Sequence, residues 1–98
     1  MAAEIRWSKN AIVDYNNIVD YLLLEWNEDI ALRFIEVLEH KIQQILRHPY
    51  TGLSTKVLNI RSVSITKHNR LYYRIWDKNL EIVNIFDTRQ DPGKDKYR

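Results

Sequence analysis

The sequence contains no cysteine, only two glycines and two prolines, and no long hydrophobic run. Without cysteine the chain can form neither a disulfide framework nor a thiolate metal site, and it suits a reducing compartment. Its longest purely apolar run is Leu22–Leu24, preceded by Tyr21, and such a run is far too short to span a bilayer. The opening residues MAAEIRWSKN also lack the hydrophobic core of a signal peptide. We therefore expect a cytoplasmic protein without a membrane partner.

Acidic residues are missing from the middle of the chain. No Asp or Glu occurs between Glu39 and Asp77, whereas this interval contains seven lysines and arginines and three histidines. Residues 1–55 carry a net charge of −3 and residues 56–98 a net charge of +5. Such asymmetry favours an anionic partner for the second half. The alternative is a charge segregation without functional meaning.

The length of 98 residues and the hydrophobic fraction of 45% are typical of one small globular domain, which we place at residues 1–98. Ser8 is a suitable N-cap for a helix over residues 9–25, in which apolar residues recur at helical spacing. Asn27 is a suitable N-cap for a second helix, which Pro49 must end. Since almost nothing separates the two helices, they are predicted to form an antiparallel hairpin.

The period of the apolar residues changes to two after the second helix. Strands are predicted at residues 56–65, 70–76 and 80–86, in addition to a short opening strand at residues 4–7. The element order is therefore β-α-α-β-β-β. This order favours an α+β fold, in which the long N-terminal helical hairpin packs on one face of an antiparallel twisted sheet.

One strand carries an unusual face. Alternation along residues 70–76 puts two arginines and two large aromatic residues on the side that we expect to point away from the core. Guanidinium groups bind phosphate through paired hydrogen bonds, and aromatic rings stack on unpaired bases. The alternative is that these arginines solvate the sheet and pair with nearby acids. The proposed anion-binding set is Lys67, His68, Tyr72, Arg74 and Trp76, with further basic residues at Arg61, Arg70 and Arg89.

The sequence does not predict a cofactor or a metal ion. Its histidines have no carboxylate at the spacing of metal ligands, and two isolated glycines cannot build a glycine-rich phosphate loop.

Several weak motifs occur together in a specific order. They are W…A..D…I..YL on the first helix, P..G after the second, R…I….RLYYRI on the strand hairpin and R..P after the last strand. In this order and spacing, over nearly the whole chain, the sequence resembles the RelE/ParE superfamily of toxins from type II toxin–antitoxin modules. The resemblance implies a growth-inhibiting toxin that a cognate antitoxin neutralises in a toxin–antitoxin hetero-oligomer. The toxin-binding part of such antitoxins is often acidic, which would suit the basic half of this chain.

The resemblance leaves the target open between two branches. The RelE-like branch cleaves messenger RNA on the ribosome; carried over to this sequence, its catalytic residues would be Arg61, Arg70, Arg89 and Tyr97. The ParE-like branch poisons DNA gyrase by binding. The long helices and the incomplete catalytic set favour the ParE-like branch, with the RelE-like endoribonuclease as the alternative. A relative that has lost toxicity remains a third interpretation.

Overall fold

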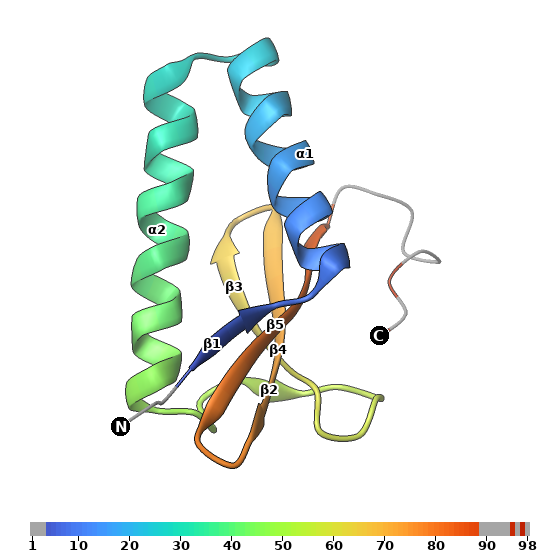
Figure 1. Ribbon diagram of the computed structural model, residues 1–98. Coiled ribbons are helices and arrows are strands. Elements are labelled where there is room, and N and C mark those ends of the chain that lie inside the picture. Colours follow the sequence, from blue (N-terminus) through green and yellow to red (C-terminus); the bar gives the residue numbers. More distant parts are fainter. Residues whose placement is uncertain (1–3, 89–94, 96, 98) are drawn as a thin grey trace.

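The computed structural model describes residues 4–88 together with Asp95 and Tyr97 (Figure 1). The described residues form two helices and five strands. In chain order these are β1 (Ile5–Trp7), α1 (Lys9–Glu25), α2 (Glu28–Arg47), β2 (Leu53–Ser54), β3 (Arg61–Thr66), β4 (Asn69–Trp76) and β5 (Asn79–Asp87). The predicted α+β class and the helical hairpin are confirmed.

Both helices begin where their capping residues predict. The Ser8 hydroxyl accepts a hydrogen bond from the Ala11 amide at 2.9 Å. The Asn27 side chain likewise accepts one from the Ile30 amide at 2.9 Å. Each cap satisfies one of the amides that the first turn of a helix leaves without an intrahelical acceptor. A single pair of residues, Trp26 and Asn27, therefore separates α1 from α2.

The sheet has the strand order β1-β5-β4-β3-β2 and is mixed rather than antiparallel throughout. β1 pairs with β5 in parallel, and the other neighbours pair antiparallel. A parallel pair needs a long crossover connection, and here the connection includes the helical hairpin and the intervening strands. The Ser8 amide donates to the Ile82 carbonyl and the Ser8 hydroxyl donates to the Val83 carbonyl, so the start of α1 is fixed along β5.

The strand predicted at residues 56–65 begins later, at Arg61. The Thr55 hydroxyl bonds to the Val57 carbonyl and the Ile60 carbonyl, and Asn59 adopts a positive φ of 69°. Local side-chain hydrogen bonds of this kind compete with strand pairing, and asparagine tolerates the left-handed conformation. The preceding loop instead contributes the short edge strand β2.

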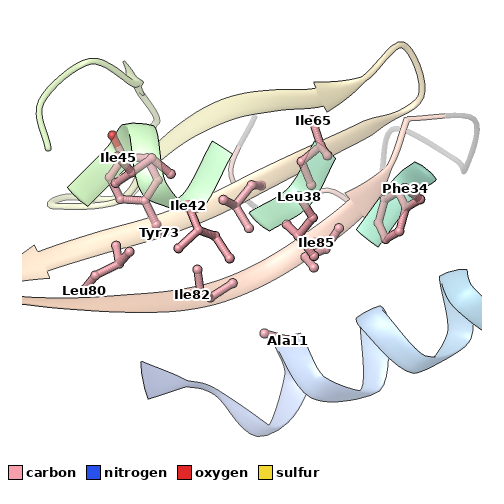
Figure 2. Packing of buried hydrophobic residues seen from close by; sticks show 11 residues of the cluster. Ala11, Phe34, Leu38, Ile42, Ile45, Ile65, Tyr73, Leu80, Ile82 and Ile85 are labelled. Atoms are coloured by element: carbon pink, nitrogen blue, oxygen red, sulfur yellow. The ribbon is translucent and has the colours of Figure 1, made fainter. Parts of the chain in front are cut away.

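The main core lies between the helices and one face of the sheet (Figure 2). α2 supplies most of the helical part of this core, including Phe34, Leu38 and Ile45, whereas Ala11 is the only buried residue of α1. Leu71 and Tyr73 of β4 enter the core from the sheet. Because side chains alternate along a strand, Arg70 and Tyr72 extend from the opposite side, which we call the outer face.

Candidate functional site

Arg70 lies on the outer face and is held by two serines of the neighbouring strand. Its Nη1 donates to the Ser62 hydroxyl at 2.8 Å and its Nη2 to the Ser64 hydroxyl at 3.3 Å. Ser64 is the residue directly opposite Arg70 in the β3–β4 pairing. Arg70 is only partly buried, and these two bonds use two of the five N–H groups of its guanidinium, so it can still bind an anion.

Tyr72 is buried, although the sequence predicts an exposed ring. Its side chain is only 2% exposed because the ring of Tyr97 packs against it, with 4.3 Å between the ring centroids. The Tyr72 hydroxyl donates to one oxygen of the Asp95 carboxylate at 2.6 Å, and the Tyr97 amide donates to the other at 3.1 Å. The prediction of an exposed Tyr72 is therefore wrong: a second small core, which also includes Ile60, covers this part of the outer face.

Tyr97 is part of a hydrogen-bond network that reaches α1. Its hydroxyl bonds to the Asn84 side-chain oxygen, and the Asn84 amide group donates to the Asp14 carboxylate at 3.2 Å. The same oxygen of Asp14 accepts from the Ile85 amide at 2.9 Å. The sequence signal for this network was weak: Asp14 is off the apolar stripe of its helix, and Asn84 interrupts an apolar strand.

Arg61 does not join Arg70 in one site. It lies directly opposite Tyr73, which belongs to the helix-side core, so Arg61 and Arg70 extend from opposite faces of the sheet. The Arg61 guanidinium donates to the Gly52 carbonyl at 2.9 Å and lies 5.2 Å from the centroid of the Tyr50 ring. The sequence predicts that Arg61 and Arg70 belong to one candidate site, but the two residues occupy positions of opposite parity and do not meet.

The same loop is tightly packed around Gly52. The Gly52 amide donates to the Tyr73 hydroxyl at 3.0 Å, and that hydroxyl donates to the Pro49 carbonyl at 2.8 Å. A Cβ atom at position 52 would lie only 2.6 Å from the Tyr73 hydroxyl oxygen. Gly52 is thus required by the close approach of the tyrosine, and Arg61 completes the attachment of this loop to β3.

Arg74 and Trp76 lie together at the far end of β4 from Arg70. The guanidinium carbons of Arg74 and of Arg6 are each 5.4 Å from the centroid of the Trp76 ring. Arg74 also pairs with Glu81 at 2.5 Å. Arg6 was not among the predicted residues; it reaches the cluster because β1 runs beside β5. Two cation–π contacts and one ion pair hold these side chains together. The pairing of Arg74 with Glu81 is what the alternative interpretation, arginines that pair with nearby acids, predicts.

The remaining predicted residues are Lys67, His68 and Arg89. Lys67 is exposed in the β3–β4 turn, and the backbone carbonyl of His68 accepts from the Thr88 amide at 2.8 Å. Arg89 lies outside the residues that the structure describes. Within the described ranges, no group of three His, Asp or Glu side chains could hold a metal ion. No helix in this part of the chain is both long and apolar enough to cross a membrane.

Two buried tyrosines titrate above their ordinary range. Burial raises the pKa of Tyr73, against a smaller opposing effect of its hydrogen bond from Gly52 and of the Arg61 charge. Burial also raises the pKa of Tyr97, and the negative charges of Asp14, Asp95 and Glu81 raise it further. Both phenols therefore remain protonated in the folded protein at pH values at which an exposed tyrosine ionises.

These shifts predict a loss of stability at high pH. Above about pH 10 the unfolded chain releases phenolic protons that the folded chain retains, so the free energy of unfolding should fall as the pH rises toward the folded-state pKa values. We expect Tyr73→Phe and Tyr97→Phe each to make this fall less steep in urea denaturation between about pH 8 and about pH 11. The control is Tyr50→Phe, which alters an exposed ring. An equally steep fall in all three variants would contradict the prediction.

A family model described as "ParE toxin of type II toxin-antitoxin system, parDE" matches residues 5–92. The chain belongs to the ParE toxin family. It is the toxin component of a type II toxin–antitoxin system, as the sequence motifs predicted. At the level of sequence, no curated protein matches this chain.

Solved structures share the fold of this ParE-family toxin at low sequence identity. A chain of the chromosomal ParDE system from P. aeruginosa is 16% identical with a TM-score of 0.72, and the match covers 86% of this chain and 94% of that chain. The YoeB/ParE toxin from Agrobacterium tumefaciens is 20% identical with a TM-score of 0.62, covering 87% and 98%. A chain of the E. coli DinJ-YafQ complex is 13% identical with a TM-score of 0.61, covering 91% and 96%.

Proposed function

We propose that this ParE-family toxin arrests growth by binding and poisoning DNA gyrase, without cleaving RNA. The observation that carries the proposal is the separation of the candidate nuclease residues. Arg61 and Arg70 extend from opposite faces of the sheet, and the Arg61 guanidinium donates to the Gly52 carbonyl on the helix side. One phosphate group cannot contact both guanidinium groups.

The chemistry of RNA cleavage makes this separation important. Attack of a 2′-hydroxyl on the neighbouring phosphorus needs a general base, a general acid and stabilisation of the developing charge around one phosphate. Tyr97 is a poor base here because its hydroxyl is bonded to Asn84, and because burial and, to a smaller extent, nearby carboxylates raise its pKa. These carboxylates would also repel a phosphate.

The second candidate function is ribosome-dependent cleavage of messenger RNA. The observation in its favour is Arg70, whose partly exposed guanidinium lies beside the hydroxyls of Ser62 and Ser64. Hydroxyl groups can rotate to donate to a phosphate oxygen, so these three side chains are able to bind an anion. They provide charge stabilisation but no general base.

The antitoxin is the other partner in this proposal. As a toxin of a type II system, the chain is expected to form a hetero-oligomer with a cognate antitoxin that neutralises it. The net charge of +5 over residues 56–98 suits an acidic antitoxin segment. On this half of the chain we propose four binding residues for the antitoxin. Two lie in the β3–β4 turn, Lys67 and His68, and two lie on the outer face, Arg74 and Trp76.

Parallel reactions with the purified toxin test the proposal. In the first, the toxin is added to bacterial DNA gyrase and relaxed plasmid; in the second, to an in vitro translation reaction whose message ends are mapped by primer extension. We expect inhibited supercoiling and an intact message. Arg70→Ala and Arg89→Ala should inhibit gyrase as well as the wild type does, with Arg47→Ala as a control at an exposed arginine of α2.

The opposite pattern would identify the nuclease. New message ends within codons at the ribosomal A site, lost by orders of magnitude in Arg70→Ala and in Arg89→Ala but not in Arg47→Ala, would establish RNA cleavage and overturn the gyrase proposal.

A further inference from the structure

The connection between α1 and α2 exposes a cluster of large apolar side chains, which we call the hairpin tip. Leu24 is 81% exposed and Trp26 is 64% exposed, and Leu23 and Ile30 are also exposed. All four lie within eight residues around the Asn27 cap. Single exposed apolar residues are common on protein surfaces, but a cluster of them commonly marks an interaction site.

The fold itself does not require these side chains. Figure 1 shows that the connected ends of α1 and α2 extend beyond the end of the sheet, so the tip has no sheet to pack on. The turn is held by the backbone: the Trp26 amide bonds to the Leu22 carbonyl, and Asn27 caps α2. Leu24 and Trp26 can therefore be replaced by polar residues with little cost to the stability of the folded chain.

The tip is also strongly acidic. Between Leu23 and Ile30, the three carboxylates of Glu25, Glu28 and Asp29 and no lysine or arginine give a net charge of −3. None of these carboxylates forms an ion pair within residues 4–88. The α2 dipole stabilises Glu28 and Asp29 at the start of that helix. Glu25 has no such stabilisation, because it is the last residue of α1 and the dipole of α1 disfavours an acid at that end.

We propose that the hairpin tip is a docking surface for a protein partner that presents an apolar recess ringed by lysine and arginine. Trp26 and Leu24 enter the recess, and the carboxylates of the tip face the basic ring. Tryptophan at the centre of a patch is among the side chains that contribute most to protein interfaces. The identification of this partner as gyrase rests on the proposed function. The inference adds which surface of the toxin binds gyrase and what kind of gyrase surface receives it.

The test uses a double substitution and a matched control. Leu24→Ser/Trp26→Ser removes the apolar tip, whereas Leu53→Ser/Leu58→Ser removes two equally exposed leucines that lie outside the hairpin, on and just after β2. Each toxin is expressed without its antitoxin to measure growth arrest, and each purified toxin is titrated in the supercoiling reaction. Thermal unfolding verifies that every variant is folded. We expect the tip variant to need about tenfold more protein, or more, for half-maximal inhibition, and the control to match the wild type.

A second variant tests the charge of the tip without removing apolar surface. Glu25→Gln should weaken inhibition of gyrase and make it less sensitive to salt, because one attractive charge is lost. The same substitution should leave the melting temperature unchanged or raise it, since it relieves an unfavourable charge at the helix end. Stability and activity are thus expected to change in opposite directions.

The outcomes separate this inference from the proposed function. Growth arrest by the tip variant at wild-type strength would overturn the tip as the docking surface. If the wild type arrests growth without inhibiting supercoiling, gyrase is not the target, and growth arrest by the tip variant alone then decides the inference. Loss of antitoxin binding by the tip variant, with growth arrest unchanged, would assign the tip to the antitoxin and overturn the inference.

Discussion

Replacing Leu38 with Ala is expected to lower the free energy of unfolding by about 2–5 kcal/mol. Leu38 is 2% exposed and lies in the middle of the core stripe of α2, between the helices and the sheet. Its truncation leaves a cavity that the surrounding side chains fill only in part, because the nearby core residues Ile65 and Ile85 are fixed to their strands (Figure 2). Urea denaturation monitored by circular dichroism gives the change directly.

The same helix supplies the matched control for this prediction. Leu32 is 49% exposed, so Leu32→Ala removes the same atoms where no core surrounds them. We expect it to change the free energy of unfolding by no more than about 0.5 kcal/mol. Similar losses in the two variants would mean that the helical hairpin is not held to the sheet by the core seen in Figure 2.

Replacing Asp14 with Ala should cost about 1–3 kcal/mol, because the amide of the buried residue Ile85 loses its acceptor. Asp14 accepts from the Ile85 amide and from the Asn84 side chain, and Asn84 in turn bonds to the Tyr97 hydroxyl. The substitution therefore affects the attachment of α1 to β5 and the position of Tyr97 together. Urea denaturation measures the first effect, and hydrogen exchange at the Ile85 amide measures the loss of its acceptor.

Asp20→Ala is the matched control, because Asp20 is an exposed carboxylate on the same helix. Its removal should leave stability nearly unchanged. If Asp14→Ala also leaves stability and hydrogen exchange unchanged, the network from α1 to Tyr97 does not contribute to folding in solution. In that case the low accessibility of Tyr97 would need another explanation.

The positions of the helices follow from local physical chemistry that the sequence contains. The caps at Ser8 and Asn27, the stop at Pro49 and the 3.6-residue period are interactions within a few residues, so the helix limits are predictable from the sequence. The residue motifs likewise led to the toxin family that the family model identifies.

Strand limits were less predictable because they depend on pairing between distant residues. β1 lies parallel to β5 because residues 75 positions apart form hydrogen bonds, such as those from Ser8 to β5. Residues 56–60 alternate as in a strand, yet the Thr55 hydroxyl and the left-handed Asn59 give them a turn.

The sequence by itself determined the helical hairpin, the α+β class and the toxin family, because these depend on local caps, periodicity and motif order. The tertiary structure alone decided which basic residues meet. Parity along each strand puts Arg61 and Arg70 on opposite faces of the sheet, and a pairing register is set by contacts that no local pattern contains. The burial of Tyr72 beneath Tyr97 was likewise decided by packing between residues distant in the chain. Whether an aromatic side chain is exposed or buried in a small core depends on which distant residues pack over it.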